Sequence, residues 1–228
     1  MSDTVQTTAI FDLDNTVTRV DTYPLFLLSM LARRPLRWLR AGILPLDLAF
    51  CRLGYRDNQW LKERALGSIA GGATPMLIER HSRELVNYIL KSKLRSGAIA
   101  ALEQHRAAGH HLILATASFD FYTQILAKQL SFDNVVCTIA ERDDHRCLTG
   151  KILGKNCYGD EKLRRIAEVL EGTRNEWHVI VYTDHHSDLP LLEWADSPRV
   201  VNPSAKMRRI AKKRGYTILD WSSPPGVD

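Results

Sequence analysis

The chain has 228 residues, 45% of them hydrophobic and 25% charged, which is ordinary for a soluble globular protein and excludes a disordered or fibrous class. The length allows one large domain, or a domain that carries a sizeable insertion. Lysine and arginine exceed aspartate and glutamate by 31 to 26. This net charge of +5 suits an anionic partner, but it does not choose among phosphate, nucleic acid and a lipid head group.

The cysteines and the N-terminus indicate a cellular compartment. The four cysteines form no CxxC pair and have no metal-type spacing to histidine, so we expect reduced thiols. The first residues lack the basic and apolar regions of a signal peptide. The apolar runs are too short to span a bilayer. From these observations we predict a cytoplasmic protein.

The first predicted element is a short apolar strand at residues 8–11, which stops at Asp12. Residues 21–96 contain no convincing strand and show helical periodicity, with Thr74 before Pro75 as a helix start and Asp57 as a second cap. We therefore predict an insertion of about four helices after the first strand. The predicted domains are a core of residues 1–18 and 97–228 and a helical cap of residues 19–96.

Beyond the insertion, strands and helices alternate. The predicted strands lie at 111–115, 134–139, 177–182, 199–201 and 216–219. The predicted helices lie at 97–108, 121–130, 161–170 and 206–213, and residues 147–153 favour a small hairpin or an extended segment. This alternation predicts an α/β fold with a mostly parallel, Rossmann-like sheet.

Acidic residues follow two of these strands. Asp12 and Asp14 are two residues apart, so their side chains point the same way if the chain stays extended. Two buried like charges need a cation or a shared proton, and one carboxylate can attack phosphorus while the other moves a proton. The alternative is a turn held by Asx hydrogen bonds. Asp184 and Asp188 follow the strand at 177–182, and carboxylates from separate segments suit Mg²⁺.

Weaker signals accompany the acids. His185 and His186 lack a third histidine or cysteine at suitable spacing, so zinc is disfavoured. Thr116 and Ser118 end the second strand, where a hydroxyl and free N–H groups can hold a phosphate oxygen or simply cap a helix. A lysine between residues 155 and 162 can offset the acids and a transferring phosphoryl group, although any single lysine is more often a surface residue.

Taken in this order, the four signals resemble the haloacid dehalogenase superfamily of phosphohydrolases, whose motifs are DxDx[T/V], a Ser/Thr at a strand end, a Lys, and an acidic pair DxxxD. They read here as 12–16, Thr116, Lys162 or Lys155, and 184–188. The resemblance covers the whole chain. The helical insertion looks like the cap of the phosphoserine-phosphatase-like branch.

The resemblance implies roles at the acidic positions. Asp12 would be the nucleophile and a Mg²⁺ ligand. Asp14 would be the general acid and base and would ligate the metal through its backbone carbonyl. The carboxylate of Asp184 would complete the protein ligands, and Asp188 would hold the metal's waters or the lysine. The family often has Gly before the fourth-motif acid, whereas this chain has Thr183.

The resemblance also implies the remaining roles. Thr116 would grip the phosphate, with Ser118 nearby as a substrate-binding residue. Lys162 is preferred to Lys155 because it opens an amphipathic helix, as the family's lysine does. Asp21 looks like the acidic cap residue that contacts substrate amines in phosphoserine phosphatases. Arg64 is its predicted basic counterpart.

We therefore predict a Mg²⁺-dependent phosphatase that hydrolyses a small phosphate monoester through an aspartyl-phosphate. A phosphotransferase on the same fold is the near alternative, and a non-catalytic binding module is disfavoured because all four motifs hold competent residues. Nucleic acid is not an expected partner, since the basic stretches at 33–40 and 206–214 lack interleaved aromatics. Specificity depends on contacts from the cap, so the sequence does not identify the ester.

Residues 36–46 mix arginine, tryptophan and aliphatic residues, as interfacial helices do. One interpretation is a membrane-surface segment, which would make a lipid phosphate the substrate. The other, which we favour from the sequence, is a cap helix that buries its apolar side on the active site.

Overall fold

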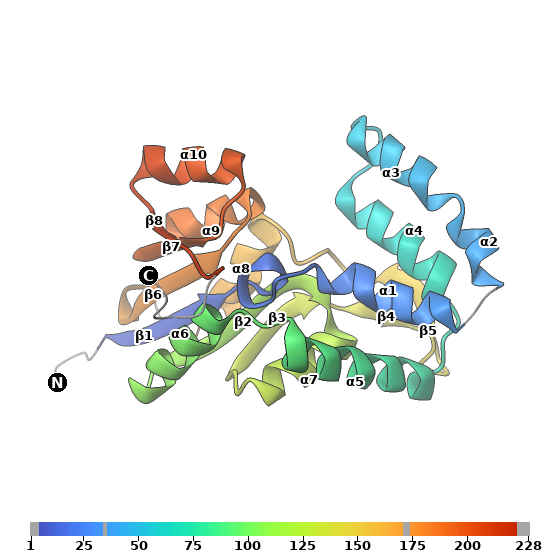
Figure 1. Ribbon diagram of the computed structural model, residues 1–228, viewed down its shortest axis with the longest axis horizontal. Coiled ribbons are helices and arrows are strands. Elements are labelled where there is room, and N and C mark those ends of the chain that lie inside the picture. Colours follow the sequence, from blue (N-terminus) through green and yellow to red (C-terminus); the bar gives the residue numbers. More distant parts are fainter. Residues whose placement is uncertain (1–4, 34–35, 171–173, 223–228) are drawn as a thin grey trace.

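A six-stranded parallel sheet forms the centre of the computed structural model, which describes residues 5–33, 36–170 and 174–222 (Figure 1). The strand order is β3-β2-β1-β6-β7-β8, and each neighbouring pair is parallel. The strands are β1 (Gln6–Phe11), β2 (His111–Phe119), β3 (Asn134–Thr138), β6 (Trp177–Thr183), β7 (Ser197–Val201) and β8 (Thr217–Leu219). The predicted α/β class is confirmed, and all six predicted strands are present.

Helices cover both faces of the sheet, because alternate residues of each buried strand point to opposite sides. On one side, Phe11 belongs to a core cluster shared with α6 (Ser96–Ala107) and α7 (Asp120–Gln129). On the other side, Ile10 packs in a cluster shared with α8 (Asp160–Val169), α9 (Leu189–Trp194) and α10 (Ala205–Arg214). The short α9 was not among the predicted helices.

The insertion between β1 and β2 is helical, as predicted, but it contains five helices rather than four before α6. They are α1 (Thr22–Ala32), α2 (Arg37–Ala41), α3 (Leu44–Arg52), α4 (Asn58–Ala70) and α5 (Pro75–Ser92). The extra helix arises because Gly42 and Ile43 interrupt one helical stretch, and Gly is a poor helix former. Asp57 caps α4 by accepting a hydrogen bond from the Trp60 N–H at 2.7 Å.

A two-stranded hairpin, β4 (Ala140–Arg142) and β5 (Leu148–Ile152), packs against α4. The contact is a close approach of two backbones: a Cβ atom on Gly150 would lie 2.4 Å from the Cα of Gly67. Backbone hydrogen bonds from the Gly72 N–H to the Leu148 carbonyl, at 2.7 Å, and back from the Leu148 N–H to Ala73 extend the attachment. The division into a core of 1–18 and 97–228 and a cap of 19–96 stays a prediction, and this hairpin joins the two parts.

The helices α2 and α3 lie along α4 at the end of the molecule farthest from the N-terminus (Figure 1). Their apolar side is exposed: Leu39 is 84% and Leu46 61% accessible, whereas Asp47 is buried. The prediction that this segment buries its apolar side on the active site is therefore wrong. Two of the inward positions, Arg37 and Asp47, carry charged groups that pair with α4 and its C-terminal end, so most of the large aliphatic residues are left outside. Among the described residues, no helix is long and apolar enough to cross a membrane.

The four cysteines are free in the structure. Cys137 and Cys157 are buried, and burial raises the pKa of their thiols to about 11 and about 12.

Candidate active site

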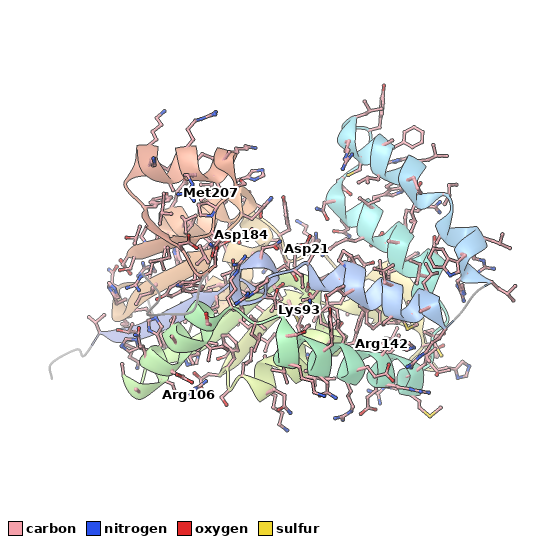
Figure 2. The ribbon with its side chains drawn as sticks, viewed as in Figure 1. Asp21, Lys93, Arg106, Arg142, Asp184 and Met207 are labelled. Carbon is pink, nitrogen blue, oxygen red and sulfur yellow. The ribbon has the colours of Figure 1, made fainter. Side chains whose placement is uncertain are left out.

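The carboxyl ends of β1, β2 and β6 meet at one edge of the sheet, where open parallel sheets bind their ligands. A cavity of about 130 Å³ lies at this edge. It is lined by Asp12, Asp14, Asn15, Asp21, Thr116, Ala117, Tyr158, Lys162, Asp184, His185, Ser187 and Asp188. Figure 2 shows Asp21 and Asp184 near the middle of the molecule, between the cap helices and α9. Residues from the first strand and from beyond the sixth, such as Asp12 and Asp188, thus share one small space.

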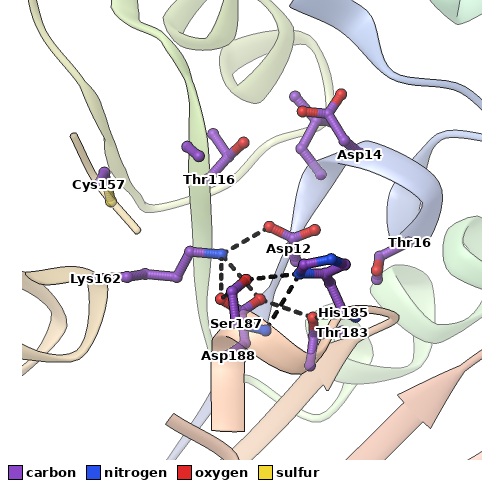
Figure 3. Close-up of polar contacts among 12 residues, drawn as sticks. Asp12, Asp14, Thr16, Thr116, Cys157, Lys162, Thr183, His185, Ser187 and Asp188 are labelled. Atoms are coloured by element: carbon purple, nitrogen blue, oxygen red, sulfur yellow. Dashed lines mark hydrogen bonds and ion pairs between the residues drawn. The ribbon is translucent and has the colours of Figure 1, made fainter. Parts of the chain in front are cut away.

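Lys162 occupies the centre of this group (Figure 3). Its Nζ lies 2.8 Å from Oδ1 of Asp12 and 2.9 Å from the carboxylate of Asp188, and its side chain is 3% exposed. Burial lowers the pKa of the lysine, but the charges of Asp12 and Asp188 outweigh burial and hold that pKa above its ordinary value. The ammonium therefore stays charged. Lys155, the alternative, is exposed and does not line the cavity.

Two short hydrogen bonds orient Asp188. Lys162 supplies one, and the Thr183 hydroxyl donates to Asp188 at 2.7 Å. Thr183 stands where the family often has Gly, and here its hydroxyl orients Asp188, which in turn pairs with Lys162. Asp188 was predicted to hold either the metal's waters or the lysine, and its described contacts include the lysine.

Asp14 lies in different surroundings from Asp12, although both line the cavity. Its carboxylate accepts hydrogen bonds from the Thr22 N–H at 2.6 Å, the Thr22 hydroxyl at 2.7 Å and the Ser118 hydroxyl at 2.6 Å. Burial raises the pKa of Asp14, and the hydrogen bonds from Ser118 and Thr22 oppose that rise. The pKa of Asp12 is also raised by burial, with the charge of Lys162 opposing. One acid is paired with a cation, and the other is held by neutral donors.

The end of β2 presents the two predicted hydroxyls differently. The strand is irregular between Ala115 and Phe119, where its register with β3 shifts. Thr116 lines the cavity and its Oγ1 accepts from the Ser118 N–H at 3.0 Å. The Ser118 hydroxyl instead contacts Asp14, so the structure places Ser118 behind the general-acid candidate rather than on the cavity wall.

The residues present fit a hard cation. Among the described cavity residues, five aspartates face one lysine, Lys162, and no arginine. Burial, and then the charge of Asp188, raises the pKa of Asp184 to about 6, and a bound cation would oppose that rise. In the part of the chain that the structure describes, no three His, Cys, Asp or Glu side chains group as metal ligands. The ligands that the resemblance implies, the carboxylates of Asp12 and Asp184 and the carbonyl of Asp14, are oxygen donors, as Mg²⁺ prefers.

The two predicted cap residues separate in the structure. Asp21 lines the cavity and accepts a hydrogen bond from the side chain of Asn15 at 2.6 Å. Arg64 does not line it; its guanidinium pairs with Asp47 at 3.1 Å and lies over the Trp60 ring. The structure therefore does not bring Arg64 together with Asp21, because Arg64 lies on the face of α4 that meets α3.

Lys62 is the cation that α4 directs toward the strand ends. Its Nζ donates to the Ala117 carbonyl at 2.5 Å and to Oδ1 of Asn156 at 3.2 Å. Burial lowers its pKa to about 8, while the charge of Asp14 opposes that fall. Lys62 was not among the predicted site residues, although a signal was present. It precedes the buried Leu66 and Ile69 at helical spacing, so a lysine stands in an apolar stripe.

The fold is an α/β sheet with helices on both faces and a helical insertion after the first strand. An acidic cavity that contains one lysine lies at the strand ends. The model of the haloacid dehalogenase-like hydrolase family matches residues 9–193, and the chain belongs to this family.

Sequence similarity to known proteins supports the resemblance to the phosphoserine-phosphatase-like branch. Phosphoserine phosphatase SerB1 of Mycobacterium tuberculosis is 26% identical over 219 residues, which covers 93% of this chain and 70% of the relative. Protein CicA of Caulobacter vibrioides is 32% identical over 161 residues, covering 70% of this chain and 71% of CicA.

Solved structures show the same fold. A Bordetella pertussis Tohama I protein of unknown function matches with a TM-score of 0.83 and 26% identity, over 96% of this chain and 100% of that one. A substrate-bound phosphoserine phosphatase matches with a TM-score of 0.63 and 13% identity, over 94% of this chain and 92% of that one. The second likeness is one of fold alone.

Proposed function

We propose that this protein is a Mg²⁺-dependent phosphatase that hydrolyses a phosphate monoester through an aspartyl-phosphate on Asp12. The observation that carries the proposal is the contrast between two acids in one cavity: Asp12 is ion-paired with Lys162 at 2.8 Å, whereas Asp14 is held by Thr22 and Ser118. Two carboxylates held in different surroundings are suited to separate nucleophilic and acid–base tasks. Membership of the hydrolase family supports the proposal, as does the likeness to phosphoserine phosphatase SerB1.

In the first step, a carboxylate oxygen of Asp12 attacks phosphorus, and the bond from phosphorus to the ester oxygen breaks. Asp14, whose pKa is raised by burial, gives its proton to that leaving oxygen. The charge of Lys162 favours the ionised form of Asp12 against the effect of burial and offsets charge on the phosphoryl group, and Asp188 keeps Lys162 in place. Thr116 binds a phosphoryl oxygen at the end of β2.

In the second step, water attacks the aspartyl-phosphate, Asp14 takes a proton from that water, and the bond between Asp12 and phosphorus breaks. Free phosphate leaves and Asp12 returns to a carboxylate. Mg²⁺ would be held by the carboxylates of Asp12 and Asp184 and by the carbonyl of Asp14, and it would supply positive charge to a phosphoryl group in an otherwise anionic cavity.

The test is phosphate release from a panel of phosphate monoesters with Mg²⁺ for the wild type, Asp12→Asn and the matched exposed-lysine control Lys155→Met. We expect Asp12→Asn to abolish turnover, because an amide does not attack phosphorus, and Lys155→Met to retain it. Acid-quenched wild type should carry phosphate on Asp12. Product analysis with a competing alcohol separates hydrolysis from phosphate transfer. Retention of more than a few per cent of activity by Asp12→Asn would remove Asp12 from the nucleophile role.

A further inference from the structure

The helical stretch from Arg37 to Arg52 has large apolar residues on its outer side, while its inner side holds two charged residues beside the small apolar contacts of Ala41 and Leu44. The positions shielded by α4 recur every three or four residues, at 37, 41, 44, 47 and 51, while their neighbours are exposed. Two of these inner positions are charged. Asp47 is 5% exposed and pairs with Arg64, and Arg37 donates to the carbonyls of Ser68 and Gly71. The charged residues at these positions therefore face the protein.

The outer side carries the apolar residues. Most of the exposed large hydrophobic side chains in the described part of the chain fall within residues 36–55. They are Leu36, Trp38, Leu39, Ile43, Leu46, Leu48, Phe50, Leu53 and Tyr55. A water-facing helix normally shows its polar side to solvent, and a contiguous apolar surface marks an interaction site. We call residues 36–56 the α2–α3 surface.

The charges on the α2–α3 surface have one sign. Arg40, Arg52 and Arg56 are exposed between its apolar residues, and its single carboxylate, Asp47, is buried and paired. A cavity of about 640 Å³ adjoins it, lined by Leu39, Arg40, Ile43, Trp60, Glu63, Arg64, Gly67, Ser68, Thr149, Gly150 and Lys151. The surface and its adjoining cavity therefore combine apolar side chains with an excess of cations.

We propose that the α2–α3 surface docks in the head-group region of an anionic membrane. A bilayer supplies both things that the surface lacks: acyl chains for its aliphatic side chains and anionic groups for its arginines. Trp38 and Tyr55 have an apolar ring and a polar group, which suits the interface. A second copy of the chain fits less well, because a two-fold contact would bring together two surfaces that both carry positive charge.

The docking has a consequence that rests on the proposed function. A protein held at the head-group region would meet phosphate esters carried by lipids, so the substrate class would be a lipid phosphate monoester. Docking itself does not depend on catalysis, and the two are measured separately.

The first measurement is co-sedimentation with phosphatidylcholine vesicles, with and without phosphatidylglycerol. We expect the wild type to bind the anionic vesicles, and both Leu39→Ser/Leu46→Ser and Arg40→Glu/Arg52→Glu to lose at least about tenfold in vesicle partitioning. The matched controls are Met76→Ser/Leu153→Ser, which removes two apolar residues exposed elsewhere, and Lys212→Glu/Lys213→Glu on α10. Both controls should bind as the wild type does. Thermal unfolding of every variant checks that it is folded.

Three results would overturn the docking proposal. One is loss of binding in the α10 variant but not in the α2–α3 variants, which would make binding a general effect of basic charge. Another is equal loss in the apolar control. The third is the absence of vesicle binding by the wild type. If sedimentation velocity then shows a dimer that Leu39→Ser/Leu46→Ser dissociates, a second copy of the chain occupies the surface instead.

The second measurement compares turnover of a phosphate ester in vesicles with turnover of a water-soluble aryl phosphate. We expect Leu39→Ser/Leu46→Ser to lose at least about tenfold on the vesicle substrate and little on the soluble one. Vesicle binding without turnover of either substrate would refute the proposed phosphatase and leave the docking proposal standing. Equal turnover of the vesicle substrate by variant and wild type would refute the lipid substrate class.

Discussion

Asp12 and Asp14 show how two identical side chains, two residues apart, come to differ. Between them the chain leaves the strand and enters an irregular turn, η1 (Leu13–Val17), in which Asn15 adopts a φ of 60°. Asn tolerates this left-handed conformation better than most residues. The turn directs Asp12 to Lys162 and Asp14 to Thr22, at the start of the first cap helix. The Asp14 carboxylate and α1 are thereby connected.

Replacing Asp14 by Asn tests the proposal that Asp12 is the nucleophile and that the side chain of Asp14 transfers the proton. We expect kcat to fall by about 10²–10⁴-fold, the usual value of general acid–base help. Mg²⁺ affinity should stay nearly unchanged, since the proposed ligand from this residue is its backbone carbonyl. An aryl phosphate with a good leaving group should lose less in the first step. Calorimetry of Mg²⁺ binding and rapid-quench detection of phosphoenzyme check both parts. A variant that loses the metal, with no dependence on the leaving group, would make the Asp14 side chain a ligand.

A comparison of Lys62 and Arg64, two cations of α4, tests which of them acts at the cavity. Lys62 joins the cap to Ala117 and Asn156 beside the cavity, whereas Arg64 pairs with Asp47. We expect Lys62→Met to lower kcat/KM by about tenfold or more, because a charge near the phosphoryl site is lost and two acceptors lose a donor. Arg64→Met should keep turnover within about twofold, but should lower stability by about 1–3 kcal/mol because Asp47 stays buried without its partner.

Kinetics and thermal unfolding of the two variants separate the roles. If Arg64→Met loses turnover while remaining folded and Lys62→Met does not, the original prediction for Arg64 is the better one.

Among the helices and strands, the contact between α4 and β5 joins the insertion to the rest of the chain. It depends on glycine at two positions, but unequally. Gly150 has a φ of 93°, and a Cβ there would meet the Gly67 backbone, whereas a Cβ on Gly67 would lie 3.7 Å from the Cα of Gly150, an ordinary contact. The requirement for glycine is therefore strict on the strand and weak on the helix.

This asymmetry predicts opposite effects of the same substitution. Gly150→Ala should destabilise the protein by about 2–4 kcal/mol, through the strained φ and the collision. Gly67→Ala should be neutral or stabilise by up to about 1 kcal/mol, because Ala is the better helix former. Denaturant unfolding of both variants measures the difference. Equal destabilisation by the two substitutions would show that the helix and the strand are packed more tightly than the structure has them.

The stability of the protein as a whole depends on a polar cluster beside the sheet. Nε2 of His105 is 2.9 Å from the Tyr182 hydroxyl, which accepts a hydrogen bond from Arg199 at 2.8 Å, and Nδ1 of His105 is 2.7 Å from the ring of His110. Burial, followed by the neighbouring charges of His110 and Arg199, lowers the pKa of His105 from 6.5 to about 4. His105 is therefore neutral in the folded protein at neutral pH.

The cluster predicts a loss of stability in acid. Between pH 6.5 and about 4 the unfolded chain binds a proton at His105 that the folded chain does not, so the contribution of His105 is complete above that range and falls as the pH drops. The loss approaches about 3 kcal/mol at the lower end, at about 1.4 kcal/mol per pH unit, before any discount for the part of the ring that solvent reaches. Aspartates with raised pKa act in the other direction, so the measurement is the difference between the wild type and His105→Gln. A difference that stays constant from neutral pH down to about 4 would contradict the prediction.

The parts of the molecule that the sequence predicted are those set by local pattern. The strands at 8–11 and 177–182 are apolar runs that stop at acids, and the ends of parallel strands meet at one edge whatever surrounds them. The orientation of α2 and α3 was not predictable in this way. Their apolar residues imply a buried side, but Asp47 and Arg37 find partners on α4 that are visible only when the helices are side by side. Lys62 was missed for the same reason, since its partners, Ala117 in β2 and Asn156 in a loop, are distant in the sequence.

The position of β1 in the middle of the sheet affects how the chain can fold during its synthesis. β1 pairs along its whole length with β6, from Gln6 with Trp177 to Phe11 with Tyr182. A ribosome therefore has to deliver the chain as far as Tyr182, out of 228 residues, before the first strand can complete its hydrogen bonds. Until then β1 has an unpaired, apolar edge, a template for pairing with another nascent chain. Chaperone capture of stalled chains should accordingly decline once Thr183 has left the exit tunnel.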